Sequence, residues 1–519
     1  MRAAIVVALA CLGDVSLGGC VIYLNPLCND QIANGDETGI DCGGSCSTKC
    51  EIGGGCRTEG DCDDANCVSG VCTAKPCDNG VRDAQETDVD CGGGTCRACS
   101  GGRTCMVDAD CFSMSCNPAS KTCSALSVSF APETRYFSGF KAYALLGGDL
   151  DGDGHSDLAV INEYGSSVGV FLDNFSTGAF ARLPSPAKPR DEPDDRALNF
   201  GPVGAYPTGG GVADFNHDGH LDVVTADYHG YSVTVLLNDG TGKLNLKPPA
   251  SYPTQDKAET SNLAVGDLNK DGNPDVVATN PQRASISVFL SHADGTLDPA
   301  INLPVGVMGG AQPFSAAIAD FNGDGNNDVA VADNTSGTLF VRLGHGDGTF
   351  EPEVPYAIGG AQSFIVIARD VNLDGKLDLV VANRSSDSVS VLLGHGDGTF
   401  KKAIVSSVGP PDVTFPGKGR PWFGPYAIAV ADINQDGVPD IVTPNFLGDS
   451  VSLLLGIGNG HFEPAIELKF GAPTDPNFMF TTPYGIVAAD FNGDGKPDFA
   501  TANAGSDDLT VRLNTGQKQ

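Results

Sequence analysis

From about residue 125 onward, short apolar runs alternate with short polar turns, and the same order of runs returns at intervals of 50 to 65 residues. In one copy the runs cover 314–319, 329–333, 338–344 and 350–356, with an Asp-Gly turn of the kind that favours hairpins between the last two. Four short strands in each repeat are typical of a propeller blade. No long run with a helical period is present, so we predict an all-β chain built from blades.

The two ends of the repeat region predict how the propeller closes. The seventh copy ends with its third apolar run, at 509–514. Residues 130–136, just before the first copy, resemble the fourth runs at 350–356 and 462–468. We therefore expect an N-terminal strand at about 128–136 to complete the last of seven blades, which would leave no free sheet edge.

Each repeat carries an acidic loop directly after its first apolar run. The first loop, Asp149-Leu-Asp-Gly-Asp-Gly-His-Ser-Asp157, has carboxylates at positions 1, 3, 5 and 9 and Gly at position 6; the other six loops have Asn at position 3. Alternate side chains of such a tight loop can converge on a hard cation such as Ca²⁺, which prefers six to eight oxygen ligands. The predicted ligands of up to seven Ca²⁺ ions are Asp149, Asp151, Asp153, Asp157, Asp214, Asn216, Asp218, Asp222, Asp267, Asn269, Asp271, Asp275, Asp320, Asn322, Asp324, Asp328, Asp370, Asn372, Asp374, Asp378, Asp432, Asn434, Asp436, Asp440, Asp490, Asn492, Asp494 and Asp498.

An EF-hand and a metal-free turn are the two other interpretations of these loops. An EF-hand requires Glu at position 12, where this chain has Val160, Thr225 or Ala278. A metal-free Asp-Gly hairpin turn would explain one loop, but seven copies with one spacing favour a metal site.

The acidic loops lie in repeats that end in a motif such as Val-Leu-Leu-Gly-His-Gly-Asp-Gly-Thr-Phe at 391–400. Together, the loops and this motif resemble the FG-GAP/VCBS repeats of the integrin α-type propeller over roughly residues 125–519. The resemblance implies a seven-bladed β-propeller in which each calcium loop joins the first and second strands of a blade. It carries metal ligation over to the loop positions given above. It does not imply integrin ligand recognition, because nothing outside the repeat consensus matches.

Composition changes the picture in one respect. The net charge of −34 argues against nucleic acid as a partner. Much of the negative charge lies in the acidic loops, so we expect the fold to depend on the metal.

Residues 1–20 have the features of an export signal. Arg2 precedes an apolar run from Ala3 to Leu12, and Leu17-Gly-Gly-Cys20 resembles a bacterial lipobox with Cys20 as the lipidation site. We expect an exported protein anchored by lipid at the bacterial outer membrane or cell surface, with ordinary signal cleavage and secretion as the alternative. No later segment reaches 18 consecutive apolar residues, so the lipid is the only membrane attachment expected.

Residues 21–124 form a small cysteine-rich module that is duplicated and resembles, more weakly, modules that precede propellers in bacterial surface lipoproteins. An even number of cysteines in an exported, Gly-rich segment predicts disulfides, and zinc binding is the alternative. Spacing does not reveal the pairing. The two sets are Cys28, Cys42, Cys46, Cys50, Cys56, Cys62, Cys67, Cys72 and Cys77, Cys91, Cys96, Cys99, Cys105, Cys111, Cys116, Cys123.

No catalytic constellation stands apart from the repeat, so we expect a binding module rather than an enzyme. Metal loops occupy one face of the propeller, and the links between blades occupy the other. One long link holds Lys418, Arg420, Trp422 and Phe423, residue types that commonly anchor ligands, although Trp422 could instead pack beneath its own loop.

The predicted partner is an extracellular glycan or protein, with no indication of an oligomeric state. An extracellular polysaccharide lyase or hydrolase and a purely structural surface module are the alternatives. A cluster of Lys, Arg, His or paired carboxylates at the mouth of the link-bearing face would favour the enzyme.

Overall fold

The computed structural model describes residues 128–174, 179–182, 204–244, 250–254, 257–306, 310–409, 424–446, 448–471 and 480–516, with short segments and single residues between 42 and 123. The chain divides into two compact units, Met1–Ala125 and Leu126–Gln519. The described residues contain strands and three short 3-10 turns but no α-helix. None of the described segments forms a helix long and apolar enough to span a membrane.

The N-terminal unit contains disulfides, as predicted, and two of the described bridges recur at equivalent positions of both copies. Two small hairpins are described, β1 (Asn66–Val68) with β2 (Val71–Thr73) and β3 (Cys116–Asn117) with β4 (Thr122–Cys123), together with the 3-10 turn η3 (Asp108–Asp110). Five disulfide bonds are described in this unit, and the ten cysteines that form them are not free thiols that could bind zinc. The pairs are Cys42–Cys50, Cys56–Cys67, Cys62–Cys72, Cys105–Cys116 and Cys111–Cys123.

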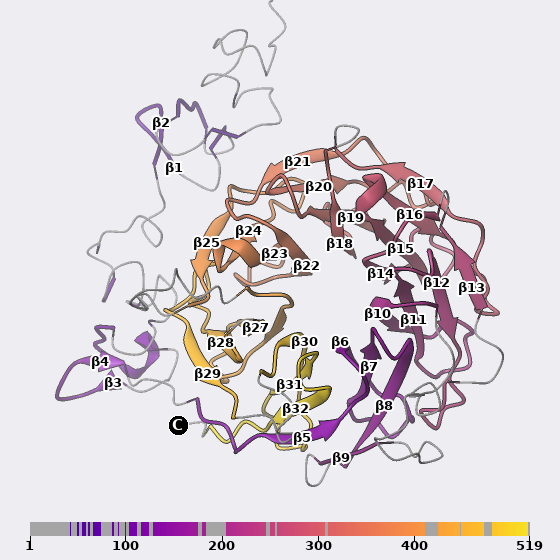
Figure 1. Ribbon diagram of the computed structural model, residues 1–519. Helices are drawn as coiled ribbons and strands as arrows, with labels where there is room; N and C mark the ends of the chain where they lie inside the picture. The colour runs from indigo at the N-terminus through magenta and orange to yellow at the C-terminus, as the bar shows by residue number, and fades with distance from the viewer. Residues whose placement is uncertain are drawn as a thin grey trace, which may run out of the picture. The chain divides into compact units, whose positions relative to one another are not determined.

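The second unit is a seven-bladed β-propeller, and each blade is a four-stranded antiparallel sheet whose first strand lies nearest the axis (Figure 1). The blades are β6 (Ala142–Gly148), β7 (Asp157–Asn162), β8 (Ser167–Asn174), β9 (Ala179–Arg182); β10 (Pro207–Ala213), β11 (Asp222–Asp227), β12 (Ser232–Leu236), β13 (Ala250–Pro253); β14 (Asn262–Gly266), β15 (Asp275–Asn280), β16 (Ser285–Phe289), β17 (Ile301–Pro304); β18 (Pro313–Ala319), β19 (Asp328–Asp333), β20 (Thr338–Arg342), β21 (Val354–Ala357); β22 (Ser363–Arg369), β23 (Asp378–Asn383), β24 (Ser388–Leu392), β25 (Ile404–Ser407); β26 (Ala429–Ala431), β27 (Asp440–Asn445), β28 (Ser450–Leu454), β29 (Ile466–Lys469); and β30 (Pro483–Ala489), β31 (Asp498–Asn503), β32 (Asp508–Arg512), β5 (Thr134–Phe137).

The ring closes through the N-terminal strand. Strand β5 pairs antiparallel with β32, with Tyr136 opposite Leu509, and so supplies the fourth strand of the seventh blade. Strands β30 and β6 of the seventh and first blades are in contact. The seven-bladed, all-β fold is as the repeats predicted.

The fourth strands start later than the apolar runs indicated. The run predicted at 350–356 becomes β21, and Phe350 makes only an isolated bridge to Gly344. Pro352 has no N–H to donate to the sheet, so regular pairing begins after it. The closing strand behaves alike, since β5 begins after Pro132.

The core lies between neighbouring blades. The second strand of every blade is buried along its whole length, and its alternate side chains face opposite neighbours. On β11, for example, Val223 packs in a cluster with Ile161 of the preceding blade, whereas Val224 packs with Leu263 of the following blade. This two-sided burial explains why the second strands are rich in Val, Ile, Leu and Ala.

Candidate functional site

The acidic loops lie where the resemblance implied. Each loop starts directly after the first strand of its blade, and position 9 is the first residue of the second strand, as between β18 and β19. The oxygen-bearing positions therefore fall on one face of the propeller.

In each loop the side chain at position 2 is buried in the core. In the loop after β18, Asp320 accepts hydrogen bonds from the N–H groups of two later glycines at 2.7 and 2.8 Å, and Asn322 Oδ1 accepts one from Asp324 at 3.0 Å. Phe321 is buried, with its ring 5.5 Å from that of Phe400 in the next blade. The loop is thus anchored by an apolar side chain worth about 1.5–3 kcal/mol on burial.

The aspartates at position 9 also accept backbone hydrogen bonds, a structural role that the sequence analysis did not predict. Asp378 accepts a hydrogen bond from the N–H of Val371 at 2.9 Å and another from the N–H of Gly394 at 2.8 Å. Burial outweighs these bonds and raises the pKa of Asp378 to about 6, and that of Asp440 to about 8. The fully buried set is Asp157, Asp222, Asp275, Asp328, Asp378, Asp440 and Asp498. Each ties its loop to strands two and three.

The loops fit a hard cation by their chemistry and by two structural observations. Carboxylate oxygens of Asp149, Asp151 and Asp157 all lie within 4.8 Å of one another. Asp267 at position 1 of the third loop has a buried Oδ1 that lacks a hydrogen-bond partner within the described parts of the chain. Clustered, partly desolvated oxygens are the donor set that Ca²⁺ prefers.

On the opposite face, one residue in or just before each first strand lines the propeller axis. It lies six residues before loop position 1, and in five blades a β-bulge occurs at this point. A bulge redirects the side chain that it carries. The seven equivalent residues are Tyr143, Thr208, Ser261, Phe314, Phe364, Tyr426 and Tyr484, and all of them line one pocket of about 240 Å³. We call this pocket the axial mouth.

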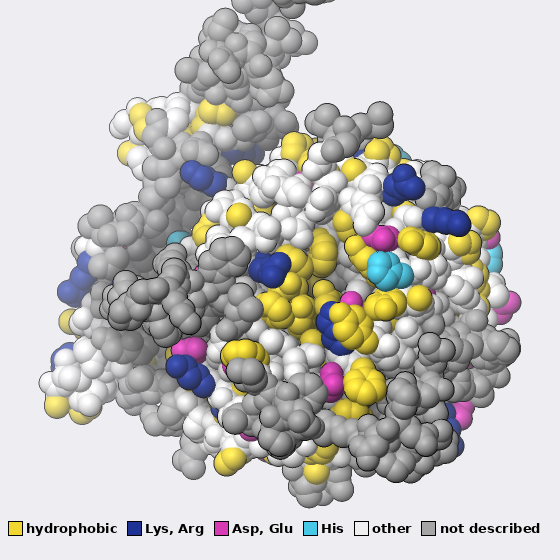
Figure 2. Space-filling model, in the orientation of Figure 1, with side chains coloured by type: hydrophobic (Ala, Val, Ile, Leu, Met, Phe, Trp, Pro, Cys, Tyr) yellow, Lys and Arg dark blue, Asp and Glu magenta, His cyan; other side chains and the backbone are white. Residues whose placement is uncertain are grey.

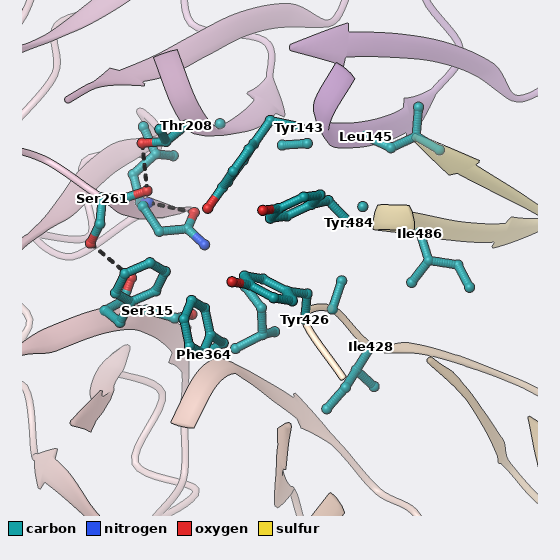
Figure 3. A pocket seen from close by; sticks show the side chains of 18 of the residues that line it. Tyr143, Leu145, Thr208, Ser261, Ser315, Phe364, Tyr426, Ile428, Tyr484 and Ile486 are labelled. Atoms are coloured by element: carbon teal, nitrogen blue, oxygen red, sulfur yellow. Dashed lines mark hydrogen bonds between the residues drawn. The ribbon is translucent and has the colours of Figure 1, made fainter. Parts of the chain in front are cut away.

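Five consecutive blades contribute aromatic rings, which form an arc around the axial mouth (Figure 3). Successive ring centroids lie 4.3 Å apart for Phe314 and Phe364, 4.4 Å for Phe364 and Tyr426, 4.5 Å for Tyr426 and Tyr484, and 4.4 Å for Tyr484 and Tyr143. Burial and neighbouring tyrosines raise the pKa of Tyr484, so its hydroxyl remains protonated and able to donate. The arc therefore combines apolar ring surface with hydroxyl groups.

Charged side chains surround the axial mouth. Arg384 lies over three aromatic rings, 4.9 Å from Tyr426, 5.3 Å from Phe364 and 5.6 Å from Phe446. Figure 2 shows hydrophobic side chains gathered at the centre of this face, with basic, acidic and histidine side chains around them. The surface is thus amphipathic, with cations next to aromatic rings.

Two further polar groups lie on the same face. Lys141 forms an ion pair of 2.6 Å with Glu163; although burial opposes the charged form, Glu163 raises the pKa of Lys141. His229 Nδ1 lies 3.6 Å from Glu259, and its ring centroid is 4.9 Å from that of Tyr206. These groups follow second strands or precede first strands, at positions that vary between repeats.

The predicted ligand residues Lys418, Arg420, Trp422 and Phe423 lie outside the described residues, so their role stays a prediction. The link that holds them ends at Gly424, whose N–H donates to Asp387 at 2.9 Å, two residues before Tyr426 of the axial mouth. Sequence reasoning missed the aromatic arc. Aligning the repeats on loop position 1 would have revealed it, because the equivalent residue is aromatic in five copies.

Comparison with known proteins agrees with the repeat architecture. A family model described as FG-GAP-like repeat matches residues 214–278, 267–331, 320–381, 370–443 and 446–501. A search of curated proteins found no match.

Solved structures with similar folds include three of low identity. Virginiamycin B lyase from Staphylococcus aureus is 10% identical, and the alignment covers 74% of this chain and 99% of the lyase, with a TM-score of 0.47. A streptogramin B lyase is 13% identical, with 74% and 98% covered and a TM-score of 0.45. A lectin from Agrocybe aegerita that recognises non-reducing terminal N-acetylglucosamine is 21% identical, with 66% and 81% covered and a TM-score of 0.43.

Proposed function

Because the chain belongs to the family of FG-GAP-like repeat proteins, we propose that it is an exported, calcium-stabilised binding module whose ligand is an extracellular glycan held at the axial mouth. The observation that carries the proposal is the arc of five aromatic rings at equivalent positions of five blades. The C–H face of a sugar ring is attracted to the negative face of an aromatic ring, and the sugar hydroxyls find partners in the tyrosine hydroxyls. Rigid strands hold both kinds of group in place.

Calcium has a structural role in this proposal. The twenty-eight loop residues named above would hold the ions, and bound Ca²⁺ supplies positive charge that offsets the repulsion between loop carboxylates. The loops lie on the face opposite the axial mouth, so the ions would support the blades without contacting the glycan.

Truncation of the arc tests the proposed site. A glycan array identifies a bound oligosaccharide, and calorimetric titration then compares the wild type with Tyr484→Ala. A true anchor costs about 2 kcal/mol or more, so affinity should fall by about 30-fold or more. Tyr252→Ala on the outer strand β13 serves as the matched control, because it removes a tyrosine away from the axis. Unchanged affinity of a folded Tyr484→Ala protein would reject the site, and binding only to a protein ligand would replace glycan as the ligand class.

An extracellular polysaccharide lyase or hydrolase is the second candidate. It is favoured by the charged groups on this face: the ion pair of Lys141 and Glu163, the proximity of His229 and Glu259, and Arg384. The two classes are separated by incubating the purified propeller with the bound polysaccharide. New reducing ends or ultraviolet-absorbing unsaturated ends that the wild type forms and His229→Ala does not would establish an enzyme. An unchanged polymer would support the binding module instead.

Lipid anchoring through Cys20 is part of the proposal. In a bacterial host, the wild type should incorporate radioactive fatty acid and fractionate with membranes, whereas Cys20→Ser should do neither. The motive is the sequence Leu17-Gly-Gly-Cys20 after an apolar run. Equal release of both proteins into the medium, with no label on either, contradicts the anchor and favours ordinary secretion.

A further inference from the structure

The seven residues that directly follow the second strands differ in chemistry although the fold makes them equivalent. Each lies fourteen residues after loop position 1: Glu163, Tyr228, Pro281, Asn334, Arg384, Phe446 and Ala504. Arg384 is the cation of this set. It opens the 3-10 turn η7 (Arg384–Ser386), and its backbone N–H donates to Gln362 at 2.9 Å, directly before β22. The backbone therefore fixes this arginine at the rim of the axial mouth.

The guanidinium of Arg384 lies among aromatic rings rather than beside a carboxylate. Its central carbon lies 4.9 Å from the ring centroid of Tyr426 and 5.3 Å from that of Phe364, and a guanidinium carries its N–H donors in its own plane. Within the described parts of the chain, no carboxylate lies within ion-pair distance of it. Arg135, Arg342 and Arg512, in contrast, all pair with carboxylates, at 2.8, 2.9 and 2.9 Å.

The charge balance of the protein offers its arginines many carboxylate partners. The chain has 65 acidic and 31 basic side chains, so carboxylates are abundant and an arginine can readily acquire one as a partner. Arg384 is instead packed against rings that line a pocket. An arginine edge next to an aromatic surface matches a ligand that combines a sugar ring with a carboxylate, because the planar fork of donors binds a carboxylate through two parallel hydrogen bonds.

We infer that the axial mouth recognises an acidic saccharide, a uronic-acid oligosaccharide, whose ring packs on the aromatic arc and whose carboxylate pairs with Arg384. This inference rests on the proposed glycan binding and narrows it to one ligand class. Lys141, another cation near the arc in the described part of the chain, already pairs with Glu163 at 2.6 Å, so we assign the charge that meets the ligand to Arg384.

The test removes one charge at a time from ligand and protein. Calorimetric titration at fixed calcium concentration compares a uronic-acid oligosaccharide with its methyl ester, which has the same rings without the charge. A charge-assisted hydrogen bond is expected to make the acid bind about tenfold to a hundredfold more tightly than the ester. Arg384→Gln should lower the affinity for the acid to that for the ester and leave the affinity for the ester unchanged, as expected of a double-mutant cycle. Arg283→Gln, on the equivalent turn of the third blade, is the matched control and should change neither affinity.

Different outcomes overturn different statements. Equal affinities of wild type for acid and ester, or an acid preference that survives in Arg384→Gln, would overturn the acidic ligand while glycan binding stands. A sulfated oligosaccharide without uronic acid that binds more tightly than the uronic acid would replace the carboxylate by sulfate and also overturn the inference. If neither oligosaccharide nor any glycan on an array binds the folded protein, the proposed function itself fails.

Discussion

Removal of calcium is expected to lower the midpoint of thermal unfolding of the propeller by roughly 20 °C or more. A ligand that binds only the folded state stabilises it by about 2.7 kcal/mol per site at 100 times its dissociation constant. The seven proposed sites would act on one closed ring, in which each loop is anchored in the core by its position 2 residue, such as Leu150 or Phe321. Together, seven such sites would contribute about 19 kcal/mol, which exceeds the whole stability of a typical domain.

Differential scanning calorimetry with excess Ca²⁺ and with a chelator measures this effect. Mg²⁺ provides the control cation, because it demands a smaller octahedral site and retains its waters, so it should restore little of the loss. An unchanged midpoint in protein shown by elemental analysis to be free of metal would contradict the calcium sites. Full recovery with Mg²⁺ would indicate general charge screening instead.

The second large effect is expected at position 9, where Asp378→Ala should destabilise the propeller with or without calcium. The substitution leaves two buried N–H groups, of Val371 and Gly394, without their acceptor. Each unsatisfied buried donor costs about 1–3 kcal/mol, so a loss of about 2–6 kcal/mol is expected in chelator, and more in calcium if the loop also loses a ligand.

Asp374→Ala in the same loop is the matched control. Asp374 is exposed at position 5 and accepts its hydrogen bonds from within the loop, from Lys376 N–H at 2.9 Å and Asn372 Nδ2 at 3.2 Å. Its removal should therefore lower stability in calcium and have little effect in chelator. Urea denaturation of both variants under both conditions measures the four differences. If Asp378→Ala did not lower the free energy of unfolding in chelator, the aspartate at position 9 would contribute to stability only as a metal ligand.

Repeated local patterns determined much of the fold. Seven copies of one loop spacing, each between apolar runs, were enough to predict seven blades, and the likeness of residues 130–136 to fourth strands was enough to predict closure by strand β5. These features can be predicted from sequence because each depends on a few neighbouring residues. Strand starts were less predictable where a proline such as Pro352 interrupts hydrogen bonding without interrupting the apolar pattern.

Pairings between distant residues needed the tertiary structure. The duplicated cysteine spacing predicted disulfides, yet only the fold showed that Cys56 pairs with Cys67 and that Cys105 pairs with Cys116 in the second copy. Several partners lie at similar separations in sequence, so spacing alone does not favour one pairing.

The axial mouth was decided by tertiary structure in the same way. Tyr143 and Tyr484 are far apart in sequence, and each is locally only the second residue of a first strand. Closing the ring brings these equivalent positions around one axis, with the two ring centroids 4.4 Å apart, and the β-bulge turns each side chain inward. The sequence by itself therefore determined the repeated blade and its acidic loop, whereas ring closure alone made a pocket from residues that each repeat contributes singly.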